Sequence, residues 1–371
     1  MKTKAAILRE TGADWEVTEL DLDEPKANEV LIRFEVSGMC HSDEHLRTGD
    51  LAPEHWPVVG GHEGAGVIEQ VGPGVSRVKE GDHVVCAFIP ACGHCRWCAT
   101  GHQNLCDLGA MLMQGCLPDG TFRFHENGTD LAAMCMLGTF SQWAVISEAS
   151  CVRIDDDIPF EVAALTGCGV PTGWGSAVYS ADVRPGENVI VYGIGGVGAN
   201  SVQGAAHAGA KNLIAVDPLA NKREMAEQMG ATHSVASAEE ALELVTELSG
   251  GLGADKTIVT VDVATAEVIG ASFEATRKGG TVVVSGLGNM QELYVQLPGA
   301  MLTLYEKTLK GSLFGGSNPV FDIVNLLDLY RAGKLKLDEL ITNRYTLDQI
   351  GDGYRDLLDG KNVRGIIVHE H

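Results

Sequence analysis

The sequence predicts an α/β protein of two domains, one rich in β-strands and one built on a doubly wound parallel sheet. Three observations support this fold class. The chain has 371 residues, more than a single hydrophobic core usually serves. Its 45% hydrophobic content and 46 glycines are typical of a compact, turn-rich α/β protein. An apolar strand at 188–192 also runs directly into a glycine-rich turn, which is the pattern found at the start of nucleotide-binding units.

The charge balance limits the possible partners. With 27 basic and 50 acidic residues, the formal net charge is −23, which disfavours nucleic acid and anionic membrane surfaces because both carry negative phosphates. No uncharged apolar stretch reaches the roughly 18 residues of a membrane span, and the first apolar run ends at Arg9, too early for a secretory signal. We therefore expect a cytoplasmic protein, in which ten cysteines indicate metal sites more than disulfides.

The first half begins with alternating apolar and polar residues at 30–36, which predict a half-buried strand. Residues 40–45 read CHSDEH and begin a short helix that Gly49 ends. This dense group of sulfur, carboxylate and imidazole suits a metal that activates an oxygen beside a proton acceptor. A polar helix capped by Ser42 or Asp43 is the alternative, and the stretch alone does not decide between the two.

Two further residues favour the metal interpretation. His62 lies in the small-residue run 58–68, where it is either a core histidine or a second ligand. Cys168 stands between two glycines, where it is either a small buried hydrophobe or a third ligand. With Cys40 these residues supply two sulfurs and one nitrogen. Three protein ligands leave one coordination position open, as in a catalytic zinc site.

The strongest local motif is a group of four cysteines at spacings of 3, 3 and 8 residues: Cys92, Cys95, Cys98 and Cys106. Four thiolates can surround one zinc ion and leave no open position, which predicts a structural site that contributes folding energy. Unrelated cysteines or a disulfide pair are the alternative. Strands are predicted at 82–85 and 138–147. The methionine-rich segment 107–137 is expected to be a long irregular loop that forms a pocket wall or an interface.

The second half carries a dinucleotide-binding motif. The strand at 188–192 continues into GIGGVG at 193–198 and a helix of small residues at 199–208. The glycines permit a tight turn, close approach of a pyrophosphate and close packing of the helix on the strand. The phosphates would rest on the helix N-terminus. The motif residues expected to bind the cofactor are Gly193, Gly195, Gly196, Val197 and Gly198.

An acidic residue in the expected place predicts which cofactor binds. Asp217 ends the next strand, 19 residues after Gly198, where it would hold the ribose hydroxyls of NAD and repel the extra phosphate of NADP. Lys222 either adds a hydrogen bond to that ribose or is a solvated helix lysine. Further strands are predicted at 213–217, 256–263, 281–286 and 302–312, with helices at 239–248, 265–277 and 318–331, which would continue the parallel sheet.

Taken together, these motifs resemble the zinc-dependent medium-chain alcohol dehydrogenases over essentially the whole chain. The matching features are the Cys40–Asp43 stretch, Gly61-His62-Glu63, the four cysteines, the Cys168 element, GIGGVG and Asp217. Within this family the phrases IPACGHCRWC, GCGVPTGWGSAV and KGSLFGGSNP resemble actinobacterial nicotinoprotein alcohol dehydrogenases. That subgroup is the N,N-dimethyl-4-nitrosoaniline-dependent type and is associated with the redox carrier mycofactocin.

The resemblance implies an architecture. A GroES-like, β-rich catalytic domain would comprise residues 1–169 and 314–371 and carry two zinc sites, and a Rossmann domain at 170–313 would bind NAD. It implies two Zn²⁺ per subunit and association into a homo-oligomer, a dimer or a tetramer. In relatives the coenzyme domains pair edge to edge through the strand that corresponds to 308–314.

The resemblance also implies residue roles. Cys40, His62 and Cys168 would hold the catalytic zinc with Glu63 nearby, and Asp43 would orient His62. Ser42 would accept the alcohol proton and pass it, through the nicotinamide ribose, to His45. The remaining expected contacts are Thr172, Leu287 and Arg364 with the cofactor, and Leu51, Phe88 and Leu137 with the substrate. One departure is His41, which stands where relatives often have a pyrophosphate-binding arginine; Arg364 would then supply the cation.

The expected reaction is oxidation of a mainly apolar primary alcohol to the aldehyde by hydride transfer to NAD. In the nicotinoprotein subgroup NAD stays bound and an external carrier reoxidises it. Three alternatives remain open at the level of sequence. They are an ordinary alcohol dehydrogenase with exchangeable NAD, a thiol-dependent formaldehyde dehydrogenase, and a non-catalytic protein that binds zinc and nucleotide.

Overall fold

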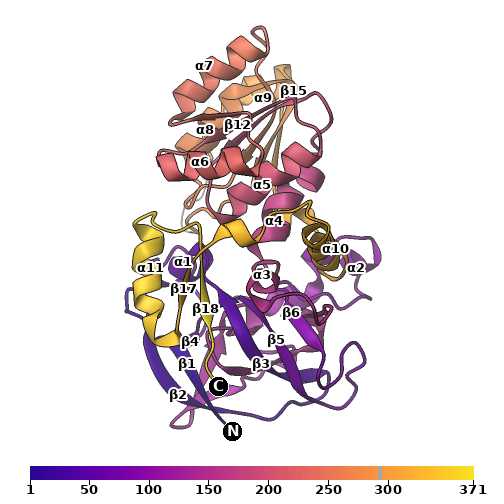
Figure 1. Cartoon of the computed structure of the whole chain (residues 1–371), viewed down its shortest axis with the longest axis vertical. Helices are drawn as coiled ribbons and strands as arrows, with labels where there is room; N and C mark the ends of the chain where they lie inside the picture. Colours follow the sequence, from indigo (N-terminus) through magenta and orange to yellow (C-terminus); the bar gives the residue numbers. More distant parts are fainter. Residues whose placement is uncertain (291–294) are drawn as a thin grey trace. The chain divides into compact units, whose positions relative to one another are not determined.

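The computed structural model describes residues 1–290 and 295–371. The chain divides into two compact units (Figure 1). The first comprises residues 1–168 and 318–371, and the second comprises residues 169–317. Both units mix helices and sheets, as the predicted fold class requires. In the described part of the chain no helix is long and apolar enough to cross a membrane.

The first unit contains a small closed barrel. Its strands follow the order β1 (Lys2–Leu8), β2 (Glu16–Leu22), β7 (Phe124–Glu126), β8 (Thr129–Ala133) and β4 (Val58–Val59). Strands β1 and β2 pair antiparallel, and β4 closes the barrel between β1 and β8. Closure leaves no free sheet edge. The barrel core is formed by apolar side chains that alternate inward along the strands.

A second sheet of this unit carries the candidate site. Its strands are β10 (Cys151–Arg153), β6 (His83–Cys86), β5 (Glu63–Val71), β3 (Glu29–Gly38), β18 (Arg364–Val368) and β17 (Ile341–Tyr345), with β9 (Trp143–Ser147) also paired to β3. Strand β3 is central and almost entirely buried. Strand β18, although late in the sequence, lies between β3 and β17, with Ile366 opposite Gly38. The sheet is therefore assembled from both ends of the chain.

Helices of the first unit border these sheets. They are α1 (His41–Thr48), α2 (Arg96–Ala99), α3 (Phe160–Leu165), α10 (Pro319–Arg331) and α11 (Ile350–Leu358). Helix α1 begins directly after β3 and ends at Gly49, whose φ of 86° is readily adopted only by glycine. Helix α3 packs on β3 and β5. Asp43 of α1 bonds to Gly61 and His62, which directly precede β5, so α1 lies at the end of β3 and beside the start of β5.

The second unit is a parallel sheet with helices on both faces. The strand order is β13 (His233–Val235), β12 (Asn212–Val216), β11 (Asn188–Tyr192), β14 (Ala254–Val259), β15 (Thr276–Val284) and β16 (Thr308–Gly311). All neighbours are parallel, and the order reverses at β11, as in dinucleotide-binding folds. The helices are α4 (Gly169–Gly175), α5 (Gly196–His207), α6 (Ala220–Met229), α7 (Ala238–Leu248), α8 (Ala266–Ala275) and α9 (Gly299–Leu304).

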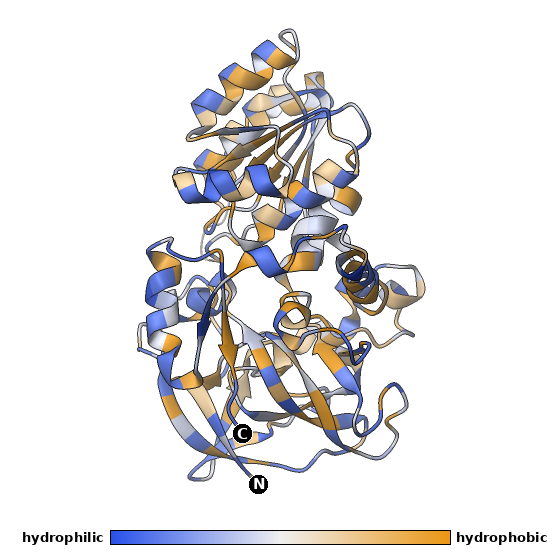
Figure 2. Ribbon diagram, viewed as in Figure 1, coloured by the Kyte–Doolittle hydropathy of each residue, from blue (hydrophilic) through white to orange (hydrophobic). Residues whose placement is uncertain are grey.

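The hydrophobic pattern explains this layering. Strands β11 and β12 are buried on both faces, so their residues form continuous apolar runs. Helices α5 and α6 contact each other, as do α7 and α8, which places one pair on each face. In Figure 2 the strands of this sheet are coloured hydrophobic, whereas α6 is mostly hydrophilic because it faces solvent.

Two sequence predictions were wrong in part. The segment 302–312 was expected to be one strand, but its first residues complete α9, and only Thr308–Gly311 form β16. The segment 107–137 was expected to be irregular, but it contains the hairpin β7–β8, which closes the barrel. In both cases long-range pairing, which local sequence does not reveal, determines where the strand lies.

Candidate metal and cofactor sites

The first site is built where β3, α1 and β5 meet. Cys40 follows β3 and caps the N-terminus of α1, and His62 immediately precedes β5. Cys168 follows α3, which packs on both strands. The structure brings these three residues and Glu63 together, with one ligand atom of each within 4.8 Å of all the others. All four are buried.

Asp43 orients the histidine of this cluster. Its Oδ1 lies 3.2 Å from Nδ1 of His62 and accepts the backbone N–H of Gly61 at 2.9 Å. Asp43 is fully buried. Because Nδ1 is engaged, Nε2 is the nitrogen left for a metal, and it is buried with no hydrogen-bond partner among the described residues. A buried ring nitrogen without a partner is costly unless it binds something. The two sulfurs and this nitrogen therefore fit zinc.

The electrostatics of the cluster also suit a cation. The pKa of the Cys40 thiol is held well below its ordinary value, chiefly because Cys168 hydrogen-bonds to the thiolate and also because His62 lies beside it. Burial alone would lower the pKa of His62, but the negative charges of Asp43 and Cys40 outweigh burial and raise it. Metal ligands of this type bind as thiolates, so a lowered thiol pKa favours binding.

Arg364 lies inside the first unit and pairs with Glu63. Its guanidinium contacts the Glu63 carboxylate, and both side chains are almost completely buried. The structure shows Arg364 paired with a carboxylate of the candidate metal cluster. This pairing was not expected from the sequence, because strand β18 brings Arg364 from a distant part of the chain to Glu63. The expected contact of Arg364 with the cofactor pyrophosphate stays a prediction.

Three further residues of the 40–45 stretch, His41, Ser42 and His45, occupy different environments. Ser42 is half-buried, and its Oγ lies 3.7 Å from Cys40 Sγ. His41 is half-buried at the start of α1. His45 is buried, and its Nδ1 lies 3.2 Å from Oδ2 of Asp50. The sequence analysis did not single out Asp50. A carboxylate directly after a helix-ending glycine is the signal that could have identified it.

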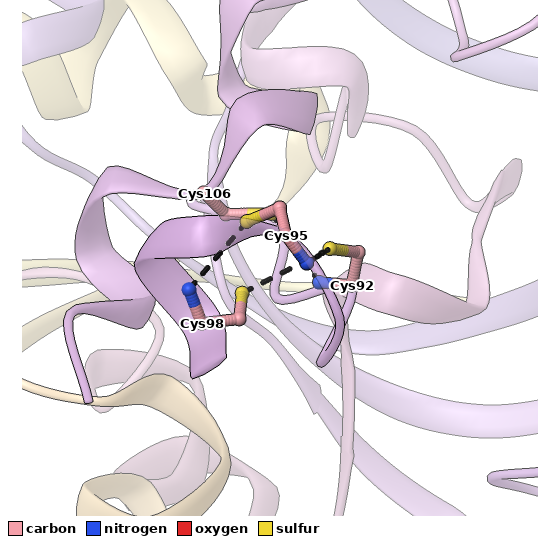
Figure 3. Close-up of side chains that lie close together, drawn as sticks. All are labelled: Cys92, Cys95, Cys98 and Cys106. Carbon is pink, nitrogen blue, oxygen red and sulfur yellow. Dashed lines mark hydrogen bonds between the residues drawn. The ribbon is translucent and has the colours of Figure 1, made fainter. Parts of the chain in front are cut away.

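The second cluster contains the four cysteines (Figure 3). The Sγ atoms of Cys92 and Cys98 are 3.9 Å apart, as are those of Cys95 and Cys106. Disulfide sulfurs lie about 2.0 Å apart, so these pairs are not bonded. Sulfurs around a tetrahedral zinc with bonds of about 2.3 Å lie about 3.8 Å apart. The observed separations therefore fit a closed zinc site.

Backbone groups support the thiolates of this cluster. The N–H of Cys95 donates to Sγ of Cys92, and that of Cys98 donates to Sγ of Cys95 (Figure 3). Hydrogen bonds from the backbone of Cys98 and Asp107 lower the pKa of Cys95 to about 6. Burial raises the pKa of Cys106 to about 12. Cys95 is therefore ionised at neutral pH without a metal, whereas a bound cation would be needed to deprotonate Cys106.

The glycine-rich turn of the second unit has the shape that a dinucleotide requires. Gly193 has φ +86°, and a Cβ at Gly198 would lie 1.9 Å from the Gly193 carbonyl oxygen. Helix α5 can therefore approach β11 only because Gly198 lacks a side chain. A Cβ at Gly195, in contrast, would meet nothing within 4 Å. Open space at the N-terminus of α5 is where a pyrophosphate fits.

Asp217 supports this turn. Its carboxylate accepts the N–H of Ile194 at 2.8 Å and that of Leu219 at 2.9 Å, so it joins the end of β12 to the turn. Lys222 is buried on α6; burial lowers its pKa, and Asp217 partly offsets that effect. A buried lysine near Asp217 does not match the alternative of a solvated helix lysine. Thr172 is buried in α4, and Leu287 is partly exposed after β15.

The residues expected to contact substrate lie in two environments. Phe88 is half-buried, with its ring 5.9 Å from the His62 ring, edge to face. Leu51 lines an apolar cavity of the first unit, whose walls include Leu46, Leu112, Met113, Met134 and Cys135. Leu137, in contrast, is fully buried in the barrel core. Its contact with substrate stays a prediction.

The chain is similar over its length to known zinc-binding dehydrogenases. The family model for the alcohol dehydrogenase GroES-like domain matches residues 26–156, and that for the zinc-binding dehydrogenase matches 196–329. The NDMA-dependent alcohol dehydrogenase of Amycolatopsis methanolica is 59% identical over 100% of this chain and 99% of that protein. Two solved structures cover 100% of both chains. An alcohol dehydrogenase zinc-binding domain protein from Burkholderia ambifaria has a TM-score of 0.93 and 31% identity, and benzyl alcohol dehydrogenase from Acinetobacter calcoaceticus has 0.92 and 29%.

Fold, sites and similarity together define an oxidoreductase of the zinc-binding dehydrogenase class. The chain belongs to the zinc-dependent medium-chain alcohol dehydrogenases. This confirms the predicted family and the predicted fold class of a GroES-like domain with a coenzyme-binding domain. Zinc and a nicotinamide dinucleotide are the cofactors that the family and the cysteine–histidine cluster indicate.

Proposed function

We propose that this enzyme oxidises a mainly apolar primary alcohol to the aldehyde, with transfer of hydride to a tightly held NAD that an external carrier reoxidises. The observation that carries this proposal is the buried set of Cys40, His62 and Cys168, whose unpartnered Nε2 and two sulfurs leave room for a substrate oxygen. The similarity to an NDMA-dependent alcohol dehydrogenase supports the tightly held cofactor.

Cys40, His62 and Cys168 would hold the catalytic zinc, with Glu63 beside it. When bound there, zinc would lower the pKa of an alcohol hydroxyl by the Lewis-acid effect that it exerts on water. Asp43 fixes the tautomer and direction of His62. Phe88 packs edge-on against the same ring and shields it from water. Cys92, Cys95, Cys98 and Cys106 would hold a second, structural zinc.

The proton of the alcohol hydroxyl would leave by way of two side chains of α1, Ser42 and His45. Ser42 lies beside Cys40 and can accept the proton of the alcohol hydroxyl. His45, one turn further along the helix, is buried and carries a carboxylate on its Nδ1. In this proposal His45 takes the proton that Ser42 passes on through the ribose of the cofactor. The acidic hydroxyl is thus deprotonated before hydride leaves the carbon.

In the second unit, the turn at 193–198 and the N-terminus of α5 would bind the pyrophosphate, and Asp217 and Lys222 the adenosine ribose. A carboxylate at this place disfavours the extra phosphate of NADP, so we propose NAD. Thr172 and Leu287 are proposed to contact the nicotinamide half. His41, at the start of α1, is proposed to take the place of a pyrophosphate-binding arginine, since Arg364 is paired with Glu63.

The substrate is proposed to be apolar because Leu51 and the methionines Met113 and Met134 line the cavity. The similarity to a benzyl alcohol dehydrogenase agrees with this. We also propose a cytoplasmic homo-oligomer, a dimer or tetramer. Strand β16 ends the parallel sheet and has an exposed edge, which can pair with the same edge of a second copy. A small redox carrier of the mycofactocin type would be the remaining partner.

The decisive experiment is spectroscopy of the protein as purified. Benzyl alcohol added without free NAD should produce the near-ultraviolet absorbance of reduced nicotinamide, and N,N-dimethyl-4-nitrosoaniline should then remove it. Native mass spectrometry of the same sample should show NAD and two zinc ions per subunit. Absence of bound NAD, with activity that needs added NAD, would instead establish an ordinary alcohol dehydrogenase. Formaldehyde oxidation that requires a thiol would establish the glutathione-type reaction.

A further inference from the structure

His45 and Asp50 form a buried histidine–carboxylate pair at the end of α1. Nδ1 of His45 lies 3.2 Å from Oδ2 of Asp50, and only 5% of the histidine side chain is exposed. The Asp50 side chain is 18% exposed. Asp50 therefore touches both the buried imidazole and solvent.

The backbone after α1 holds Asp50 in this position. Gly49 adopts a left-handed conformation, with φ 86°. Because of this turn, the N–H groups of Gly49 and Leu51 both donate to the His45 carbonyl at 3.0 Å. The chain thus folds back on His45, and the residue between those two amides is Asp50. Thr48 donates its hydroxyl to Asp50 Oδ2 at 2.6 Å and fixes the carboxylate further.

The neighbouring carboxylates do not compete for His45. Glu44 is paired with Arg47 through Nε at 2.9 Å and 3.0 Å. Asp43 is committed to His62 and to the Gly61 amide. Asp50 is the carboxylate that the structure places on Nδ1 of His45.

We infer that Asp50 is a positioning residue for proton release, which holds His45 by Nδ1 and conducts its proton to solvent. Nδ1–H donates to the carboxylate, so neutral Nε2 faces the incoming proton. Uptake at Nε2 forms an imidazolium, which the Asp50 charge stabilises. The Nδ1 proton then passes to Asp50 and from there to water, which leaves a neutral ring whose remaining proton is on Nε2. When the external carrier takes the hydride, that proton returns through Ser42 to the carrier, and Asp50 returns a proton from water to Nδ1, so the ring regains its starting tautomer. One proton crosses His45 in each direction per cycle, and the ring itself transfers no electrons.

This inference rests on the proposed function, because His45 must receive a proton from the alcohol. It adds a residue that touches neither substrate nor cofactor. An amide at position 50 could donate to Nδ1 and stabilise the opposite tautomer, in which Nε2 already carries a proton and cannot accept one. Asp50→Asn should therefore stop the relay although it preserves the shape of the side chain.

The test uses purified protein with its zinc and NAD content verified by mass spectrometry. Single-turnover reduction of bound NAD by benzyl alcohol is measured for wild type, Asp50→Asn and Asp50→Glu. General acid–base steps contribute about 10²–10⁴-fold, so Asp50→Asn should be slower by about 10-fold or more, and Asp50→Glu should recover much of that loss. Added imidazole buffer should accelerate Asp50→Asn and leave wild type unchanged, because a small base can replace the missing proton path.

The matched control is Asp130→Asn. His125 Nδ1 and Asp130 Oδ1 form a similar pair at 2.8 Å, but Asp130 is exposed and lies in the β7–β8 hairpin. This variant should keep wild-type rates. A readout independent of activity is the ¹⁵N spectrum of His45, which should show a protonated Nδ1 in wild type and a changed tautomer in Asp50→Asn.

Failure of the proposed function can be distinguished from failure of the role inferred for Asp50. If wild type does not reduce its bound NAD, the proposed function is wrong, and this inference falls with it. If wild type reduces NAD and Asp50→Asn does so at the same rate without buffer acceleration, only the role of Asp50 is wrong. A slow Asp50→Asn variant that imidazole does not accelerate, with an unchanged ¹⁵N spectrum, would also overturn the inference.

Discussion

Oδ1 of Asp43 lies 3.2 Å from Nδ1 of His62, and the same oxygen accepts the amide of Gly61. One buried carboxylate therefore fixes both the ring of a candidate metal ligand and the backbone that carries it. The ion pair of Glu63 and Arg364, which belongs to the same cluster through Glu63, is also buried. Charged groups shielded from solvent thus border the candidate metal ligands.

Asp43→Asn is expected to reduce zinc affinity and turnover by about 10–100-fold, because the amide cannot hold His62 in the required tautomer as the carboxylate does. Zinc content after dialysis against a chelator and the rate of alcohol oxidation are the measurements. Asp82→Asn is the matched control, since Asp82 is buried and accepts the amide of Lys79 at 2.9 Å outside the cluster. Equal zinc loss in both variants would contradict a specific role for Asp43.

The two metal clusters should respond differently to substitution. His62→Ala is expected to abolish turnover in a protein that remains folded, because the other three residues of the cluster stay in place. Cys92→Ser should damage folding first, because structural zinc contributes about 10 kcal/mol or more in small domains, comparable with the whole stability of a protein.

Soluble yield, thermal unfolding and zinc count distinguish these outcomes. Cys116→Ala, a buried cysteine outside both clusters, serves as the control and should remain soluble. A stable Cys92→Ser protein that loses only turnover would contradict the structural assignment. Near-normal turnover of a folded, zinc-analysed His62→Ala protein would contradict the catalytic one.

Two glycines of one turn should have separable effects. Gly198→Ala would place a Cβ 1.9 Å from a backbone oxygen, so it should lower the free energy of unfolding by about 3 kcal/mol or more. Gly195→Ala meets nothing within 4 Å, so stability should change by less than about 1 kcal/mol. Its Cβ would instead occupy the space proposed for the pyrophosphate. The measurements are urea denaturation and the NAD content of the purified protein, and full NAD content in a stable Gly195→Ala variant would place the cofactor elsewhere.

His369 should make stability depend on pH. Burial lowers its pKa from 6.5 to about 3, with a contribution from His371. The unfolded chain therefore binds a proton between these pH values and the folded chain does not. The stability that depends on neutral His369 is complete above pH 6.5 and is lost as the pH falls toward 3.

At about pH 5 this loss should amount to about 2 kcal/mol relative to neutral pH. The free energy of unfolding of wild type and His369→Gln, measured at both pH values, tests it. The variant should show a smaller decrease than wild type. An identical decrease would mean that His369 is not the responsible group.

Much of the parallel sheet could be predicted from the sequence, because its strands are continuous apolar runs and its turn carries a glycine spacing with few other uses. The grouping of the candidate metal ligands was predictable for a similar reason, since sulfur ligands are chemically distinctive. The β7–β8 hairpin was not, because its short strands acquire their conformation from pairing with β2 and β4. At 302–304 an apolar run had no marker to distinguish helix from strand.

Residue pairs that are joined only by tertiary contacts could not be predicted from the local sequence. Nothing near Arg364 in the sequence indicates Glu63, and the Asp50–His45 pair depends on a left-handed turn that reverses the chain within two residues. Leu137, which the family resemblance suggested as a pocket residue, is completely buried, and its contact with substrate stays a prediction.

The insertion of β18 between β3 and β17 has a consequence for biosynthesis. A ribosome makes the cysteine-rich first segment early, yet the strand that completes its sheet, together with the arginine that neutralises Glu63, emerges only after the whole second unit has been made. During that interval the end of β3 at residues 36–38 lacks the strand that pairs with it, and a carboxylate destined for burial has no counter-charge. The second unit, continuous in sequence, can fold first, so the nascent first unit needs protection from aggregation until residue 364 is available.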